Sequence, residues 1–220
     1  PEGDAFHAIG GENEMISAMI ADGYTGDKGL GGFYMTGDDG TELARPLSGA
    51  GEALKAPRAR DKALPDAAIR AADAAATRGE PLLEIIAGND DCARFCRRVL
   101  ARVLAYAASL VPEVTSSPQD IDDAMKLGFN WQRGPFEMID AIGHDHMAEL
   151  VAEAGVKTPA VLTEGGEFYR AEGRTLEVRH AGGGYHQVSL PEGVMRFHMT
   201  RRTLTPITAN NSASLFALEG

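Results

Sequence analysis

The sequence lacks the features that mark several classes of protein. It has two cysteines, one tryptophan and 6% aromatic residues in 220 positions. No apolar run approaches the roughly 20 residues that a membrane-spanning helix needs, so we expect no membrane span. The chain begins Pro1-Glu2-Gly3-Asp4, without an initiating methionine or the basic-then-apolar segment of a secretion signal. These absences predict a cytoplasmic protein that is a piece of a longer polypeptide.

Positive charge is scarce as well. Lysine and arginine together number 21 against 32 aspartates and glutamates, which gives a net charge of −11. Such a surface repels phosphate backbones, so we expect no nucleic-acid partner. Cys92 and Cys96 lie four residues apart, which is not the Cys-x-x-Cys spacing of redox and zinc sites. We expect these two to be buried, reduced thiols.

Groups that could bind a metal or carry catalysis are also few. Of the six histidines only His144 and His146 lie close together, and their place at the start of a helical pattern predicts solvated or capping residues. No Gly-x-Ser-x-Gly pattern marks a nucleophilic serine. The glycine-rich loop 23–32 lacks the phosphate-binding patterns that precede a helix, so it predicts a turn. We expect neither a metal nor a bound cofactor in this chain.

Apolar periodicity predicts a mainly α fold. The longest helix is expected at 90–110, with Asn89 as its N-cap and a wide apolar face in the core. Ser117 to Asp120 reads as a capping box that starts a helix through Leu127. The further helices are predicted at 4–22, 66–78, 145–154 and 158–164.

The pattern becomes extended toward the C-terminus. Glycine-rich turns separate four extended segments, at 167–170, 175–179, 185–190 and 194–199. They predict a small β-hairpin or meander. Residues 41–64 are expected to form an irregular connection, and 203–220 an inter-domain linker.

A Phe-Tyr pair occurs twice in similar surroundings. Phe33-Tyr34 and Phe168-Tyr169 each follow a helical pattern ended by glycine and a glycine-containing loop, and each precedes a charged turn and an extended segment. A complete helical body, starting near residue 80, precedes only the second pair. The repeat predicts two copies of one domain, the first of them truncated.

The most informative segment is 128–143. It holds the one tryptophan, Trp131, and a Gly134-Pro135 turn that opens a short helix ended by Gly143. Acids three residues apart on this helix could act as acid and base if they were buried, although such acids are usually solvated. A capped helix beside an aromatic anchor is the alternative interpretation. The candidate site residues are Trp131, Gly134, Pro135, Phe136, Glu137 and Asp140.

Residues 104–143 also carry a family pattern, in Pro112-Glu113, Asp122 to Met125, Gly128 to Glu137 and Asp140 to Gly143. This segment closely resembles the C-terminal helical domain of bacterial 3-hydroxyacyl-CoA dehydrogenases. In particular it looks like the second such domain of the multifunctional proteins of fatty-acid β-oxidation. Gly26 to Tyr34 is similar, more loosely, to the end of the first such domain.

The resemblance implies a fold of tandem helical domains like the C-terminal domain of 6-phosphogluconate dehydrogenase. Residues 1–50 would be the tail of the first domain and 51–79 a connection with one alanine-rich helix. Residues 80–190 would be the second domain. Residues 191–220 would lead to a crotonase-like hydratase domain outside this sequence.

The resemblance also implies a function. The whole protein would oxidise (S)-3-hydroxyacyl-CoA with NAD, using a histidine and a glutamate of a Rossmann domain that this sequence does not contain. The chain would supply a helical, cleft-forming part and no catalytic residue. Its expected partners are the Rossmann and hydratase domains, the acyl-CoA substrate, and either a second copy or a thiolase subunit. The alternative is a non-catalytic helical module that binds a partner protein.

Overall fold

The computed structural model describes residues 3–4, 7, 13–44, 58–59, 63–76, 79–173, 175–195, 197–201, 204–210 and 213–217. The chain divides into two compact units, Pro1–Leu64 and Pro65–Gly220, which we describe separately. Helices dominate, and the sheets are small and antiparallel. None of the helices described is long and apolar enough to cross a membrane.

The first unit joins one helix to a small sheet. Helix α2 (Glu14–Ala21) begins where the side chain of Asn13 accepts hydrogen bonds from two backbone N–H groups. Most of the predicted helix before Glu14 lies outside the described residues. Strands β1 (Tyr34–Thr36), β2 (Glu42–Ala44) and β3 (Arg58–Ala59) pair in sequence order. The prediction of an irregular connection at 41–64 was therefore wrong where β2 and β3 form.

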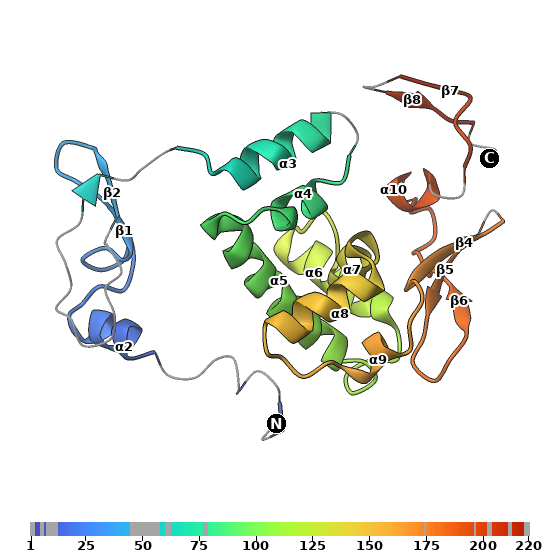
Figure 1. Ribbon diagram of the computed structural model, residues 1–220, viewed down its shortest axis with the longest axis horizontal. Helices are drawn as coiled ribbons and strands as arrows, with labels where there is room; N and C mark the ends of the chain where they lie inside the picture. The colour runs from blue at the N-terminus through green and yellow to red at the C-terminus, as the bar shows by residue number, and fades with distance from the viewer. Residues whose placement is uncertain are drawn as a thin grey trace. The chain divides into compact units, whose positions relative to one another are not determined.

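The second unit contains the remaining helices, of which α3, α4, α7, α8 and α9 contact α5 (Figure 1). Their bounds are α3 Asp66–Ala76, α4 Pro81–Ala87, α5 Asp91–Ser109, α6 Pro118–Phe129, α7 Pro135–Ile142, α8 His144–Glu153, α9 Ala160–Thr163 and α10 Phe197–Thr200. The predicted mainly helical fold is confirmed at this level. Apolar spacing succeeds here because each helix buries one face against its neighbours.

Helix α5 is the central element of this unit. Its small residues Ala101, Ala105 and Ala108 are at most 1% exposed, which lets α4, α7, α8 and α9 approach it closely. The expected wide core face is only partly correct, because Phe95, Val99 and Val103 are 67%, 40% and 39% exposed. Cys92 and Cys96 are free thiols, but they are half-buried rather than buried.

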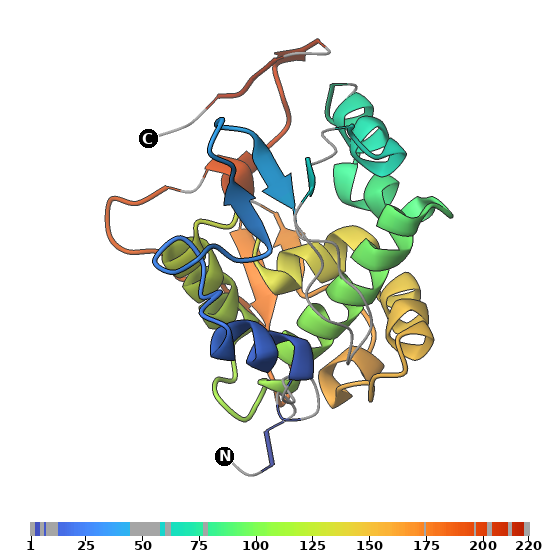
Figure 2. The same ribbon diagram turned by 90° about the vertical axis from the view of Figure 1, so that its left-hand side faces the viewer.

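A three-stranded sheet lies beside the helices in both views (Figures 1 and 2). Strands β4 (Tyr169–Glu172), β5 (Thr175–Arg179) and β6 (Tyr185–Gln187) form the predicted meander. The fourth predicted strand, 194–199, is wrong, since Phe197–Thr200 forms the short helix α10. Within the expected linker, Thr208–Ala209 and Ser214–Leu215 pair as strands β7 and β8.

Helix ends differ from the prediction by one or two residues. The N-cap of α5 is Asp90, whose side chain accepts from the Ala93 N–H, and not Asn89. Ser117 makes no capping bond at α6; instead the hydroxyl of Thr115 donates to the Asp120 carboxylate. Helix α6 continues past Leu127 to Phe129, and Asn130 ends it in a left-handed conformation with φ 55°.

Truncation of Leu104 tests the core around α5. Leu104 is fully buried, so Leu104→Ala should leave a cavity and lower the free energy of unfolding by about 2–5 kcal/mol. Urea denaturation followed by circular dichroism measures the change. Leu127→Ala is the matched control, because Leu127 is 79% exposed. An equal loss in both variants would contradict the assignment of α5 as the core helix.

Candidate functional site

The candidate residues gather around the start of α7. Gly134 is its N-cap and Pro135 its first residue, where a missing N–H costs nothing. The Glu137 carboxylate turns back and accepts from the Gly134 N–H at 3.0 Å. Phe136 is fully buried. The sequence therefore predicted this helix start correctly.

Glycine cannot supply a capping side chain, and a residue of α6 takes that role. One carboxylate oxygen of Asp122 accepts from the Phe136 N–H at 2.8 Å, and the other accepts from the Glu137 N–H at 3.1 Å. These are two of the N–H groups that a helix start leaves without partners. A carboxylate at this place is also favoured by the helix dipole.

Asp122 binds the sheet as well as the helix. The hydroxyl of Tyr169, the first residue of β4, donates to its second oxygen at 2.9 Å. Asp122 and Tyr169 are both 0% exposed. Burial raises the pKa of Asp122 from 3.8 to about 7, while its bonds to Phe136 and Tyr169 act in the opposite direction. Burial and the neighbouring Asp122 raise the pKa of the Tyr169 hydroxyl well above its ordinary value.

The position of Asp122 explains the glycine at 134. A methyl group on Gly134 would overlap the side chain of Asp122. The carboxylate occupies the space where any other residue would place its Cβ atom. Gly134 is therefore fixed by a close approach rather than by an unusual backbone angle, since its φ is −77°.

An ion pair closes the site on the side of α6. Lys126 Nζ lies 2.8 Å from Glu137 Oε1, and both side chains are 10% exposed. Asp123 approaches the same lysine at 3.5 Å. Because little water screens this pair, removal of one partner would leave a costly unpaired charge.

Asp140 holds the Phe-Tyr pair from the other end of α7. Its two carboxylate oxygens accept from the N–H groups of Phe168 and Tyr169, at 2.7 and 2.8 Å. His144 was predicted to be solvated or capping, which is wrong: its side chain is 12% exposed. The imidazole packs on the Phe168 ring, with centroids 5.1 Å apart.

We call Asp122 and Asp140 the carboxylate pair. Together they accept four backbone N–H groups and one hydroxyl, and so fasten α6, α7 and β4 to each other. Every carboxylate oxygen of the pair has a donor within the protein. The arrangement is suited to holding a backbone in place rather than to transferring protons to a substrate.

Trp131 lies apart from this cluster. It lines an apolar groove of about 580 Å³, which we call the Trp131 groove. Arg133 and Glu80 form an ion pair of 2.8 Å at this groove. The lining residues are Glu80, Pro81, Leu82, Ile85, Val99, Leu100, Val103, Trp131, Gln132, Arg133 and Met138.

The structure thus unites five of the six candidates and separates Trp131. Sequence reasoning missed the roles of Asp122, Lys126 and Tyr169. The presence of Asp122 in the family pattern was the one sequence signal that could have indicated its role. Its partner Tyr169 lies 47 residues away. The expected solvation of Glu137 and Asp140 is wrong as well, since both side chains are largely buried.

The glycine-rich loop 23–32 does not have the geometry of a dinucleotide-binding loop. The glycine-rich loop 23–32 follows helix α2 and leads into strand β1, whereas a dinucleotide loop follows a strand and opens a helix. Its glycines instead close a tight turn in which Gly26 and Gly31 pair as a bridge. No group of three or more potential metal ligands occurs in the part of the chain that the structure covers.

Comparison with known proteins finds a family match for part of the second unit. Residues 95–174 match the model of the 3-hydroxyacyl-CoA dehydrogenase C-terminal domain. This match includes α6, α7 and both members of the carboxylate pair. The segment therefore belongs to the C-terminal domain family of 3-hydroxyacyl-CoA dehydrogenases.

Longer relatives are similar to most of the chain. A probable 3-hydroxyacyl-CoA dehydrogenase of Bacillus subtilis is 32% identical over 212 residues, which are 93% of this chain and 26% of that protein. A putative fatty acid oxidation complex trifunctional enzyme of Rickettsia felis is 26% identical over 155 residues, or 70% of this chain and 19% of that protein. A protein of the same name from Rickettsia prowazekii is 27% identical over 140 residues, which are 63% of this chain and 17% of that protein. The chain thus spans about a quarter or less of these relatives. No solved structure matches it.

Substitution of Gly134 tests the close approach of Asp122. Gly134→Ala should force the carboxylate away from the start of α7 and cost about 1–3 kcal/mol or more of stability. Gly128→Ala is the control, since a methyl group there meets nothing within 4 Å and alanine favours a helix. Urea denaturation should show a loss in the first variant and none in the second. A neutral Gly134→Ala would refute the fixed position of Asp122.

The pKa of Asp122 predicts a pH dependence of stability. A raised pKa in the folded state means that the folded protein holds the proton more tightly than the unfolded chain does. The stabilisation that results from this tighter proton binding is fully present below pH 3.8, the pKa of Asp122 in the unfolded chain. It is lost as the pH rises through about 7, the pKa in the folded protein. The loss amounts to at most about 4 kcal/mol, at 1.36 kcal/mol for each pKa unit.

Asp122→Asn removes this titration. The stability difference between wild type and Asp122→Asn, measured by urea denaturation from about pH 4 to about pH 8, should shift against the wild type as the pH rises. Asp145→Asn, at an exposed position of α8, should leave the pH dependence unchanged. Parallel stability curves for wild type and Asp122→Asn would rule out the raised pKa.

Proposed function

We propose that the chain is part of an NAD-dependent (S)-3-hydroxyacyl-CoA dehydrogenase of fatty-acid β-oxidation. The observation that carries this proposal is the family match of residues 95–174, together with the similarity to the Bacillus subtilis protein over 93% of the chain. The chain supplies a helical part that helps to form the substrate cleft. The nucleotide-binding and catalytic residues belong to another part of the protein.

The chemistry of the site supports a structural role. The carboxylate pair is fully used by backbone and hydroxyl donors, and Lys126 and Glu137 neutralise each other. A catalytic acid or base needs access to the substrate proton, which the fully buried Asp122 does not have. We therefore assign no catalytic residue and no bound cofactor to the chain.

We further propose that the two units derive from tandem copies of one domain like the C-terminal domain of 6-phosphogluconate dehydrogenase. The support is a shared element order: a helix, a glycine-containing loop, a Phe-Tyr pair at the start of a strand, and a three-stranded antiparallel sheet. Residues 1–50 are the tail of the first copy and 80–190 the second. Residues 51–79 connect them, and 191–220 lead to a hydratase domain.

The partners follow from this placement. In the whole protein the chain adjoins a Rossmann domain and a crotonase-like domain, and it meets the acyl-CoA substrate in the cytoplasm. The Rickettsia relatives are named putative fatty acid oxidation complex trifunctional enzymes, which supports an assembly with a further partner, either a second copy or a thiolase subunit. A non-catalytic interaction module is the second candidate, favoured by the exposed apolar side chains Phe95, Val99 and Val103 of α5.

Activity measurements separate these candidates. With (S)-3-hydroxybutyryl-CoA and NAD, the whole protein encoded by the parent gene should form NADH, and the 220-residue chain alone should form none. Titration of the chain with acetoacetyl-CoA should give no binding. An inactive whole protein, without a Gly-x-Gly-x-x-Gly strand-to-helix turn, would favour the interaction module. Binding of acetoacetyl-CoA by the chain alone would contradict its purely structural role.

A further inference from the structure

The chain leaves the β4–β6 sheet at a point that a side chain of α6 holds. Val188, which follows β6, still pairs with the sheet, since its N–H donates to the Leu176 carbonyl at 2.9 Å. The N–H of Ser189 instead donates to Gln119 Oε1 at 3.0 Å, and its carbonyl accepts from Gln119 Nε2 at 2.5 Å. A carboxamide carries an acceptor and a donor side by side, as a backbone does. Gln119 therefore pairs with Ser189 as an antiparallel strand would.

Gln119 is itself held in one orientation. It is the second residue of α6 and is 6% exposed. Its Nε2 atom lies 3.2 Å from Asp123 Oδ2, one turn further along the helix, so both ends of the amide have partners. The Ser116 carbonyl, just before α6, accepts from the Ala181 N–H at 2.8 Å. The start of α6 thus fastens both the β5–β6 turn and the exit of the chain from the sheet.

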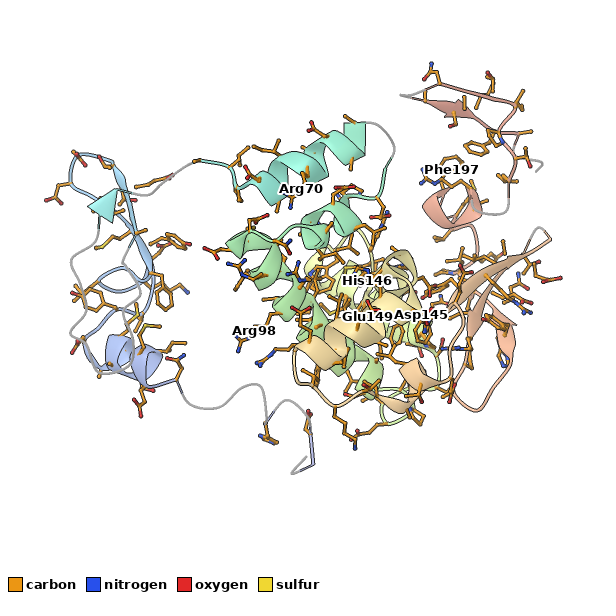
Figure 3. The ribbon with its side chains drawn as sticks, viewed as in Figure 1. Arg70, Arg98, Asp145, His146, Glu149 and Phe197 are labelled. Carbon is orange, nitrogen blue, oxygen red and sulfur yellow. The ribbon has the colours of Figure 1, made fainter. Side chains whose placement is uncertain are left out.

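The chain beyond this point has a different character. Residues 190–195 contain a turn in which Gly193 has the left-handed φ of 73° and Val194 is 47% exposed. The elements that follow contact each other: β7 pairs with β8, and the Phe197 ring of α10 (Figure 3) packs edge-on against Phe216, with centroids 5.5 Å apart. An exposed turn between a fixed residue and a separately paired segment is where a chain can bend.

A polar network connects Gln119 to the start of α7. Asp123, which accepts from Gln119, lies 3.5 Å from Lys126 Nζ, and Lys126 pairs with Glu137 of α7 at 2.8 Å. The side chains of Asp123, Lys126 and Glu137 are 21%, 10% and 10% exposed. Because little water reaches these groups, each hydrogen bond in the network influences the next one. The path runs from the Ser189 backbone to the helix start that the carboxylate pair holds.

We propose that Gln119 is a latch that fixes the point where the chain leaves the second unit, and that residues 190–195 are the hinge beyond it. Asp123 and Lys126 couple the latch to the start of α7. The hinge lets the following segment reorient without disturbing the carboxylate pair. That this segment leads to a further domain rests on the proposed function; the latch and the hinge do not, and they can be tested on the 220-residue chain.

Hydrogen exchange tests the latch. Gln119→Ala should speed exchange of the Ser189 amide by about tenfold or more relative to the Leu104 amide in the core of α5, because the amide loses its acceptor. The Leu104 amide corrects for any change in overall stability. Gln187→Ala, at an exposed position of β6, is the matched control and should leave the ratio unchanged. An unchanged ratio in Gln119→Ala would overturn the latch.

Backbone ¹⁵N relaxation tests the hinge. The amides of α5 and of Ser189 should share one rotational correlation time, and those of β7 and β8 should show a shorter one. In Gln119→Ala the Ser189 amide should relax like β7 and β8, since its fixed partner is gone. One correlation time for α5, β7 and β8 would refute the hinge.

A double-mutant cycle tests the coupling. Asp123→Ala should speed exchange of the Ser189 amide about threefold or more in the wild-type background, because Gln119 loses the bond that orients it. In the Gln119→Ala background it should have no further effect, since the path runs through Gln119. Asp145→Ala, at an exposed position of α8, should change neither rate. Equal effects of Asp123→Ala in both backgrounds would show that the network does not couple to the latch.

Discussion

The fold of the second unit depends on one buried carboxylate, that of Asp122. Placing a charge or a carboxyl group out of water is costly unless donors replace the lost water. Here two backbone N–H groups of α7 and the hydroxyl of Tyr169 replace it, and Lys126 lies one helical turn along α6. Since these donors come from both α7 and β4, Asp122 cannot be satisfied until α6, α7 and β4 have come together. This requirement makes their assembly cooperative.

The neighbouring residues follow from the same constraint. Gly134 leaves the space that Asp122 fills, Pro135 starts α7 without a donor, and Glu137 turns back on the Gly134 N–H. The backbone at 168 and 169 is then held by Asp140 from the far end of the same helix. The Gly-Pro-Phe-Glu pattern is therefore explained by packing and hydrogen bonding, without any need for catalysis at α7.

Sequence patterns predicted the parts of this arrangement that are local. Proline and glycine marked the ends of α7, and apolar spacing located α5 and α8, because these signals act within one or two helical turns. The hydrogen bond between Asp122 and Tyr169 joins residues that are 47 positions apart, and the spacing of apolar residues along the chain cannot predict such a contact. Burial of His144 depends likewise on the distant Phe168 ring. Residues 194–199 were predicted as an extended segment between glycine-rich turns, but Phe197–Thr200 forms a helix.

The two Phe-Tyr pairs share the same backbone structure but differ in how deeply their side chains are buried. Tyr34 and Tyr169 each start a strand of a three-stranded sheet, so the local sequence is sufficient for that backbone. Their burial is opposite, however: Tyr169 is 0% exposed and Tyr34 is 63% exposed. The difference arises because α6 and α7 supply Asp122, Asp140 and the Phe136 ring around the second pair. In this chain, burial of a Phe-Tyr pair at the start of a strand therefore depends on the helices and carboxylates that surround it, and not on the pair alone.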